Sequence, residues 1–291
     1  MRKGFAYKLL KAQYDAVMSP RRTAARQPIA LRIADDLRIK IETGELRAGD
    51  DLPTLQQLAE QYECSTVTAR GAIALLKQQG LILGGRGHAA RVRPMPRRIE
   101  RSNLRHQLEK DLVRQPEEVR ATKGLAEIDM GGPVADFEID AAYSIVSADQ
   151  GLADAFRLPE GTSLLRREFT HRDKRTGALE AWSVSWMPCD LIKPNPAISD
   201  PANKAWPGGT MHQLYTVGVE VAEVIDQVTA EMPTTVEAQE WQLSEGVPLM
   251  WTRRISIDTD ERVVEVSDAQ YPADRTMLSF HTPLARWEDT K

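Results

Sequence analysis

Residues 65–80 read STVTARGAIALLKQQG, and this stretch decides the fold of the first part of the chain. Its first six residues carry three hydroxyl groups and one arginine, whereas the next ten are mostly apolar and helix-forming and end in a glycine. Ser65 suits a helix N-cap, and Gly80 suits the residue that ends a helix. We therefore predict a helix that presents a polar N-terminal end and buries its apolar body in a small core.

The segments on either side of this helix predict a helix-turn-helix with a β-hairpin. Upstream, IALRIADDLRIKIETGEL (29–46) has apolar residues at every fourth position, as a helix does, and LQQLAEQY (55–62) follows Thr54 as a second, capped helix. Downstream, LILGGRGHAARVR (81–93) combines an apolar strand, a glycine-rich tip and a basic return strand. Three helices followed by a hairpin predict a winged helix-turn-helix over residues 28–93, and the third helix of this fold can enter the major groove of DNA.

The charge of the chain is divided between its two parts. Residues 1–105 carry 20 basic and 10 acidic side chains, whereas the remaining residues carry 18 basic and 32 acidic ones. A basic first part and an acidic second part are typical of a module that binds a polyanion joined to a module of another kind. A basic surface exposed only to solvent would have the same composition, so charge alone leaves both interpretations open.

Composition and spacing exclude several classes of protein. There is no run of 18 apolar residues, so we expect no membrane span. The N-terminal sequence MRKGFAYKLLKAQYDAVM is too polar for a signal peptide, and Cys64 and Cys189 do not make a disulfide framework, so we expect a cytoplasmic protein. The five histidines lack metal-ligand spacing, and no nucleophile or phosphate-binding motif is present, so we expect no metal, no cofactor and no enzyme activity.

After the winged helix the pattern changes to short strands. Residues 1–27 read as a basic extension, and residues 94–125 read as a charged linker with room for one helix. From residue 126 onward, two pairs of strand-like segments flank the turns RDKRTG and DTDE, and a capped helix lies between the pairs. This pattern predicts an α+β domain with a mostly antiparallel sheet over residues 126–288.

Three motifs of the first domain carry a resemblance to a known family. They read GELRAGDDLPTLQQLA (44–59), CSTVTARGAIALL (64–76) and GRG (85–87). In the second domain, LADAFRLPEGTSLLRREFTHRDKRTGALEAWSVSWMP (152–188) and the strands within 245–280 match more loosely. With these motifs the chain resembles GntR-family transcriptional regulators of the HutC subfamily. The resemblance implies a winged helix-turn-helix joined to a UTRA domain, which binds an effector, dimerises and has a chorismate lyase-like fold.

The resemblance assigns DNA contacts to the second helix, the third helix and the wing. These positions are Gln56, Ser65, Thr66, Thr68, Arg70, Arg86, Gly87 and Arg91. Gln56 and Thr66 stand where the family has arginines, so we expect an operator that differs from the common family sequence. Hydroxyls at a helix start can also serve only as caps, which is the role we expect for Ser65.

Other basic residues of the first part are candidates for phosphate contacts. Arg93 continues the basic strand that contains Arg91, and we expect it to contact phosphates as well. The arginines at positions 21, 22 and 26 either replace the lost phosphate contacts or form a solvated tail.

The resemblance places an effector pocket between the two strand pairs of the second domain. Family members that bind sugar phosphates use an R-x-R pair, a Glu on the partner strand and a closing Glu and Tyr. In this chain the R-x-R positions are Phe169 and His171, and the position of the partner-strand Glu is Ser183. The closing pair is Glu265 and Tyr271, and Arg167 is a nearby cation. Phe169 offers a phosphate no charge and no donor, so we expect a less charged, partly aromatic or apolar effector and not a sugar phosphate; a pocket without a ligand remains an alternative.

The resemblance and the residues together predict a ligand-responsive transcriptional regulator. We expect a homodimeric repressor that binds a palindromic operator in double-stranded DNA and is released by a small-molecule effector. Two alternatives remain open at this point. One is a ligand-independent winged-helix protein for plasmid maintenance or transfer control, and the other is an enzyme of lyase-like fold.

Overall fold

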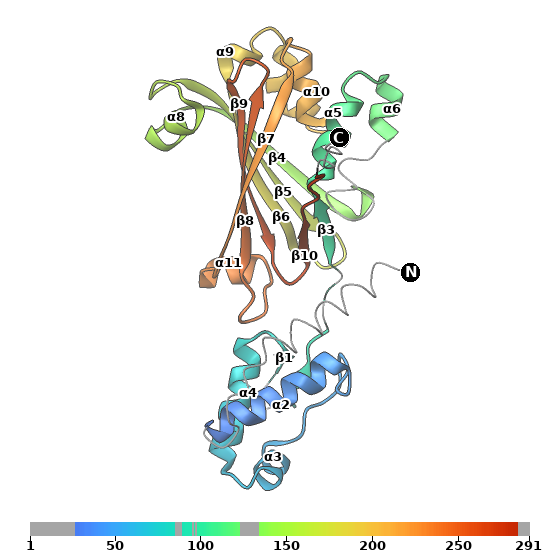
Figure 1. Cartoon of the computed structure of the whole chain (residues 1–291), viewed down its shortest axis with the longest axis vertical. Helices are drawn as coiled ribbons and strands as arrows, with labels where there is room; N and C mark the ends of the chain where they lie inside the picture. Colours follow the sequence, from blue (N-terminus) through green and yellow to red (C-terminus); the bar gives the residue numbers. More distant parts are fainter. Residues whose placement is uncertain (1–26, 85–88, 95, 97, 123–133, 285–291) are drawn as a thin grey trace, which may run out of the picture. The chain divides into compact units, whose positions relative to one another are not determined.

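The computed structural model divides the chain into two compact units, residues 1–94 (unit 1) and residues 95–291 (unit 2) (Figure 1). The structure describes residues 27–84, 89–94, 96, 98–122 and 134–284. The arginines of the basic extension therefore lie outside the described residues. None of the described helices combines the length and the apolar character that a bilayer crossing requires.

Unit 1 is a winged helix-turn-helix, as predicted. It contains α2 (Ile29–Thr43), α3 (Leu55–Gln61), α4 (Thr66–Gln78) and an antiparallel pair of short strands, β1 (Ile82–Leu83) and β2 (Arg91–Val92). An additional bridge joins Asp51 to Arg91. The described part of the wing thus pairs with itself and with the turn before α3.

Local signals start and stop the helices of unit 1 where the sequence predicts. Thr54 caps α3 in a capping box with Gln57, and Ser65 caps α4. Gly44 adopts a left-handed backbone conformation, φ 82°, after α2, as a helix-ending glycine does. The apolar faces of the three helices and the wing form one core, whose buried members include Ile33, Leu37, Leu58, Ala69, Ala72, Ile73, Leu76, Ile82 and Val92.

Unit 2 is built on a six-stranded sheet in which every pair of neighbouring strands is antiparallel. The strand order is β4-β5-β6-β9-β8-β7. The strands are β4 (Phe137–Ser147), β5 (Ser163–Asp173), β6 (Leu179–Pro188), β7 (Val221–Glu231), β8 (Leu249–Asp258) and β9 (Val263–Pro272). The two predicted hairpins are β5-β6 and β8-β9, and they meet in the centre of the sheet through β6 and β9.

Short helices cover parts of both faces of this sheet. The α-helices are α5 (Leu104–Leu112), α6 (Glu117–Thr122), α8 (Gln150–Phe156), α9 (Cys189–Ile192), α10 (Gly209–Tyr215) and α11 (Thr235–Glu240). The described residues of unit 2 also form the 3-10 helices η2 (Val134–Asp136), η3 (Pro196–Ser199) and η4 (Pro201–Asn203). Alternation along β5 separates two cores, because Leu165 packs with α10 through Leu214 whereas Leu164 packs with α8 through Phe156.

Most of the predicted linker is an integral part of unit 2. Its first ordered segment, β3 (Ile99–Ser102), pairs in parallel with β10 (Thr276–Ser279), and α5 then packs against α10. Glu109 of α5 is buried and accepts a hydrogen bond from the backbone N–H of Met211 at 3.0 Å. A parallel pairing between such distant segments has no local sequence signal. The charged composition of residues 94–125 therefore led to the prediction of a linker and not of a part of the second domain.

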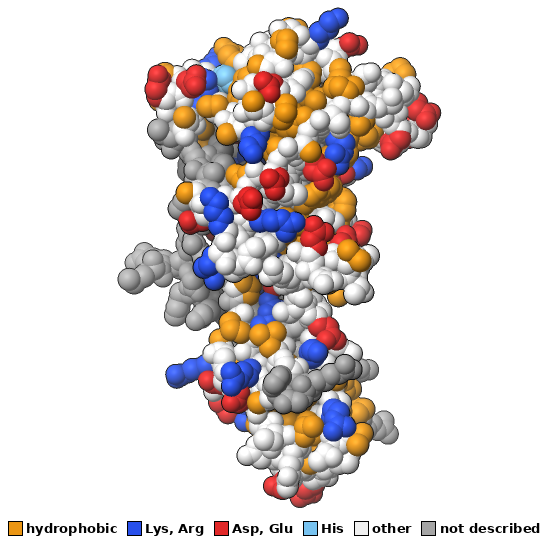
Figure 2. All heavy atoms as spheres, turned by 180° about the vertical axis from the view of Figure 1, so that it is seen from behind, with side chains coloured by type: hydrophobic (Ala, Val, Ile, Leu, Met, Phe, Trp, Pro, Cys, Tyr) orange, Lys and Arg blue, Asp and Glu red, His pale blue; other side chains and the backbone are white. Residues whose placement is uncertain are grey.

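The predicted division of charge between the two parts of the chain does not give the face shown in Figure 2 a single sign. Figure 2 shows acidic and basic side chains interspersed with hydrophobic ones on the face that it presents, in both units. Attraction of a polyanion to this face therefore depends on where individual basic side chains lie and not on the net charge.

Candidate DNA-binding surface and ligand pocket

The N-terminal end of α4 contains an internal cap. The Ser65 hydroxyl accepts a hydrogen bond from the backbone N–H of Thr68 at 3.1 Å, and the two hydroxyl groups lie 2.9 Å apart. Ser65 thus has the capping role expected from the sequence. Thr68 is half-buried, and its hydroxyl is engaged in the same cap.

Three other side chains at this end of α4 are exposed. Thr66 and Arg70 lie one helical turn apart on the same side of the helix, and Val67 is 70% exposed. Within the described part of the chain, the side chains of Thr66 and Arg70 have no hydrogen-bond or ion-pair partner. A hydroxyl, two methyl groups and a guanidinium can therefore meet base edges, thymine methyl groups and phosphates. Val67 was not predicted as a contact, although an apolar residue among polar ones at a helix tip is a usable signal.

The remaining predicted DNA contacts are in different situations. Gln56 is exposed on α3 and donates to Glu60 Oε1 at 3.3 Å. Arg91 is exposed on β2, where its Nε lies 2.6 Å from Asp51 Oδ1, so a phosphate would compete with this carboxylate. The wing-tip positions Arg86 and Gly87 lie outside the described residues.

Arg93 is not placed for the phosphate contact predicted from the sequence. Arg93 is only 7% exposed, and its Nη1 donates to the backbone carbonyl of Gly80 at 3.1 Å. A cation at this position stabilises the carbonyl end of α4. Its role is therefore to hold the recognition helix against the wing.

Unit 2 contains a cavity of about 260 Å³ on the α10 side of the sheet. All six residues predicted as effector ligands line it: Arg167, Phe169, His171, Ser183, Glu265 and Tyr271. The strand register brings them together, because Phe169 of β5 lies beside Ser183 of β6, which lies beside Ala269 of β9. The predicted site residues thus belong to one cavity.

Small side chains form the floor of this cavity, and larger ones form its sides. In the middle of the sheet the floor consists of Ser183, Ser185, Ser267 and Ala269. On the β4-β5 side, the rings of Tyr143 and Phe169 meet edge to face with centroids 5.9 Å apart. On the opposite side the sheet carries polar residues. Ser267 of the floor pairs with Arg254 of β8, which pairs with Asp226 of β7.

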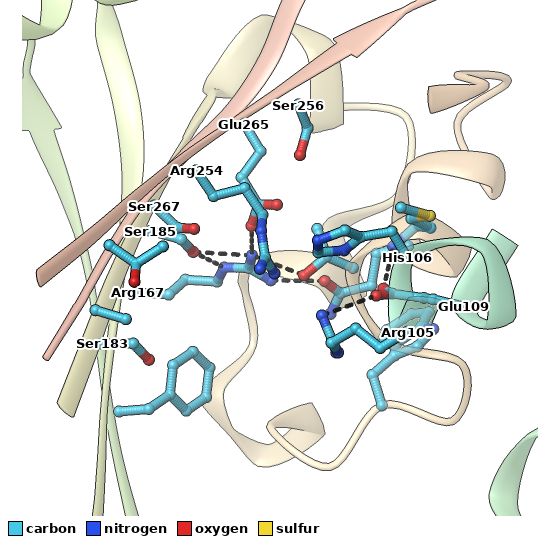
Figure 3. A pocket seen from close by; sticks show the side chains of 18 of the residues that line it. Arg105, His106, Glu109, Arg167, Ser183, Ser185, Arg254, Ser256, Glu265 and Ser267 are labelled. Carbon is cyan, nitrogen blue, oxygen red and sulfur yellow. Dashed lines mark hydrogen bonds and ion pairs between the residues drawn. The ribbon is translucent and has the colours of Figure 1, made fainter. Parts of the chain in front are cut away.

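Arg167 is buried, and protein groups accept most of the hydrogen bonds that its guanidinium can donate. It is 3% exposed, and its guanidinium donates to Ser185 Oγ at 2.9 and 3.1 Å, to Gln213 Oε1 at 2.6 Å and to Glu265 Oε1 at 2.9 Å (Figure 3). A further contact reaches Thr210 Oγ1 at 3.4 Å. Arg167 thus lines the cavity and also holds the floor and α10 in place, and its role as a cation for the effector stays a prediction.

Glu265 is the buried partner of Arg167. Burial raises the pKa of the Glu265 carboxyl above its ordinary value, and the Arg167 guanidinium opposes this rise. A β-bulge places Glu265 opposite Ser256 and Val263 opposite Ile257, with Val264 between them. This bulge lets Val264 enter the apolar core while Glu265 enters the cavity.

A charged wall closes the cavity on the side of β7, β8 and α5. Figure 3 shows Arg105, His106 and Glu109 projecting from α5 toward the sheet. Arg105 lies 3.4 Å from Glu109. Asp226 of β7 accepts from Arg254 at 2.8 Å and from His106 at 3.0 Å.

Asp226 is ionised at neutral pH in this wall. Burial raises the pKa of Asp226, but the hydrogen bonds from His106 and Arg254 outweigh it and hold that pKa well below its usual range. The carboxylate therefore joins two strands and a helix with a fixed negative charge.

Sequence reasoning missed the contribution of the segment before residue 126 to this cavity. Arg101 of β3, and Arg105, His106 and Glu109 of α5, all line it, although they belong to the predicted linker. The charge of the segment was visible, but its place in the fold depends on the pairing of β3 with β10.

Comparisons with known proteins agree with both units. Residues 29–92 match the gntR family of bacterial regulatory proteins, and residues 140–276 match the UTRA domain. An HTH-type transcriptional regulator of Streptomyces coelicolor is 26% identical over 258 residues, which cover 88% of this chain and 93% of the relative. A second HTH-type transcriptional regulator, of Rhizobium meliloti, is 25% identical over 254 residues, which cover 86% and 93% of the two chains.

A solved structure shares the fold of the chain. It is a crystal structure of a GntR-family transcriptional regulator, with a TM-score of 0.66 and 24% identity, and the match covers 89% of this chain and 99% of that one. The combination of a winged helix-turn-helix with an antiparallel UTRA sheet, predicted from the motifs, is confirmed.

Proposed function

We propose that this chain, which belongs to the GntR family of transcriptional regulators and carries a UTRA domain, is a homodimeric repressor that a small organic effector releases from a palindromic operator. In this proposal α4 reads the operator in the cytoplasm, and the cavity of unit 2 receives the effector. The proposal goes beyond the family assignment in three respects, namely the sign of regulation, the symmetry of the operator and the response to a ligand.

The proposed ligand response is supported by the part of the chain that forms one wall of the cavity. β3 begins at Ile99, only five residues after unit 1 ends at Pro94, and β3 and α5 contribute Arg101, Arg105, His106 and Glu109 to the cavity. A molecule bound there contacts the segment that leads directly to the DNA-binding unit. Differential contacts of this kind are the physical requirement for coupling two sites, and such coupling is typically worth about 1–3 kcal/mol.

The exposed end of α4 supports a palindromic operator. Thr66, Val67 and Arg70 span one turn of one helix, so one copy can read only a few base pairs. Two copies related by a two-fold axis read two half-sites, whose centres lie about one helical turn or a near multiple apart. The dimer therefore supplies the specificity that a single helix lacks.

Selection of bound sequences from random DNA by the purified full chain tests the proposal. We expect a palindrome, and a complex that contains two copies of the chain per duplex in sedimentation experiments. An asymmetric selected site bound by one copy would contradict the proposed assembly.

The response to a ligand separates the proposal from a ligand-independent DNA-binding protein. Ser183→Phe, which fills the centre of the cavity floor, should leave operator binding intact and give a constantly repressed operator reporter in cells. The wild-type reporter should instead vary with the carbon source. A reporter that behaves identically with both forms under all growth conditions would favour the ligand-independent alternative.

A further inference from the structure

Six residues of unit 2 lie between the main cavity and a smaller one of about 70 Å³. They line both cavities, and we call them the shared wall: Arg101, Arg105, His106, Thr252, Arg254 and Tyr271. They come from β3, α5, β8 and β9, so two of the four contributing elements belong to the segment next to unit 1.

The shared wall contains buried polar atoms that lack a protein partner. Thr252 Oγ1, Arg101 Nε and His106 Nδ1 have no hydrogen-bond partner among the described residues, and Thr252 is only 8% exposed. A buried polar atom costs free energy unless it is hydrogen-bonded, and in folded proteins protein groups, water or ligands supply the bond. Thr252 Oγ1 and Arg101 Nε therefore lack the partner that their burial calls for, and both residues line the cavity.

One positive charge of the shared wall is unmatched. Arg105 pairs with Glu109 and Arg254 pairs with Asp226. Arg101 has no carboxylate within 4 Å among the described residues; the carboxylate that it influences, Glu180, is paired with Arg275 at 3.0 Å. The Arg101 guanidinium lies 4.0 Å from the centre of the Tyr271 ring, which holds it in place without neutralising it. A single unmatched guanidinium suits a monoanion, whereas a phosphate monoester carries a charge of about −1.5 to −2.

The opposite side of the cavity is aromatic and holds one exposed cation. Tyr143 and Phe169 form that side, and the small floor residues leave room between them and the shared wall. Lys204 is exposed there and donates to the Ile139 carbonyl at 2.9 Å, so it lies in contact with solvent at the β4 edge. The volume of about 260 Å³ is slightly below the usual range for drug-sized ligands, about 300–1,000 Å³, and limits the occupant to a small metabolite.

We propose that the shared wall is an anion subsite and that the effector is a small organic acid with one carboxylate and an apolar body. The carboxylate accepts from Arg101 and Thr252, and the body lies over the serine floor toward Phe169 and Tyr143. The lost R-x-R cations of β5 are thereby replaced by a cation from β3. This inference deepens the proposed function, since it names the chemistry of the molecule that the same cavity receives.

Calorimetric titration of the full chain with matched compounds tests this subsite. Two pairs share a body and differ in charge: phenylacetate with 2-phenylethanol, and hexanoate with 1-hexanol. Phenyl phosphate and glucose 6-phosphate represent the dianionic alternatives. We expect at least one acid to bind about tenfold or more tightly than its alcohol, because hydrogen bonds to charged groups are the stronger ones, and to bind more tightly than either phosphate.

Two variants assign that preference to the shared wall. Arg101→Met should weaken binding of the acid by about tenfold or more and leave binding of the alcohol unchanged. Thr252→Val, which keeps the side-chain shape, should produce a smaller loss of the same kind and serves as the second test if Arg101→Met is poorly folded. Arg166→Met, on the opposite face of β5, is the matched control and should bind like the wild type.

Several outcomes would overturn the subsite. They are equal binding of acid and alcohol in both pairs, tightest binding of a phosphate, no binding of either acid at millimolar concentration, or an Arg101→Met variant that keeps the preference. Operator selection is measured separately from these titrations. A chain that prefers acids but selects no DNA sequence contradicts the proposed function alone, whereas one that selects an operator without preferring acids contradicts the subsite alone.

Discussion

Arg70 is the residue of α4 on which the proposed DNA recognition most depends. It is exposed, it lacks a partner among the described residues, and it lies one turn from Thr66 on the same side of the helix. We predict that Arg70→Ala weakens operator binding by about 1–3 kcal/mol per half-site, or roughly fivefold to 150-fold for each, because a guanidinium contact to a base edge or phosphate is lost. Electrophoretic mobility shift with the selected operator measures this loss.

The matched control for Arg70→Ala is on the same helix. Gln78→Ala replaces an exposed side chain at the other end of α4 and should bind the operator like the wild type. Both variants should keep the circular dichroism spectrum and the dimer. Normal operator affinity of Arg70→Ala would show that this face of α4 does not read the DNA.

Arg167 and Glu265 form a buried pair whose members depend on one another. Arg167→Met leaves the Glu265 carboxylate buried without its cation, and we predict a loss of about 3–5 kcal/mol in the free energy of unfolding near neutral pH. Urea unfolding monitored by tryptophan fluorescence measures this loss. The double variant Arg167→Met/Glu265→Gln removes both charges and should recover part of the stability.

The loss caused by Arg167→Met should depend on pH. Burial already raises the pKa of Glu265, and removal of the opposing guanidinium raises it further. The folded variant then binds a proton more tightly than the unfolded chain, so stability is highest below the ordinary carboxyl pKa and falls as the pH rises through the raised value. Unfolding at about pH 5 and about pH 8 should therefore give a smaller loss at the lower pH. A loss that is the same at both would contradict the buried pair.

At the scale of elements, the N-cap of α4 links helix stability to the recognition surface. Ser65 satisfies the backbone N–H of Thr68 and shares a hydroxyl contact with that residue. We predict that Ser65→Ala destabilises unit 1 by about 1 kcal/mol, because a terminal N–H of α4 loses its acceptor. Thermal unfolding measures the effect, with Ser163→Ala at the start of β5 as a control for a serine without a cap. An unchanged midpoint would contradict the capping role.

The elements with local signals could be predicted from the sequence, and those that depend on distant pairing could not. Thr54, Ser65 and Gly44 mark helix ends by their own chemistry, and the alternation along β5 identified Phe169 and His171 as neighbours on one face. The pairing of β3 with β10 has no such mark, so the wall residues of β3 and α5 were assigned to a linker.

The state of a side chain within a predicted site was also beyond local reasoning. Arg167 was correctly placed in the cavity, but its hydrogen bonds are made to Ser185, Gln213 and Glu265, which come from three other elements. Arg93 was read as part of a basic strand, but the carbonyl of Gly80 at the end of α4 holds it in the interior. In both cases the partner is set by tertiary packing and not by spacing along the chain.

At the scale of the whole molecule, the proposed two-fold assembly doubles the number of DNA contacts that a substitution removes. Each phosphate neutralised by a protein cation contributes about 0.9 to the slope of log affinity against log salt on duplex DNA. Arg91 is exposed on the wing and can exchange Asp51 for a phosphate. In a dimer on two half-sites, Arg91→Ala therefore removes two such contacts, and we predict that the salt slope falls by about 1.8 instead of about 0.9.

The measurement is a series of operator-binding isotherms at increasing potassium chloride for the wild type and for Arg91→Ala. Arg172→Ala, which replaces a half-buried arginine of unit 2 paired with Glu240, is the matched control and should leave the slope unchanged. A decrease of about 0.9 would mean that only one copy contacts the DNA through its wing, and this would contradict the symmetric assembly. An unchanged slope would mean that Arg91 keeps Asp51 as its partner in the complex, and the phosphate contacts would then have to come from other cations of unit 1.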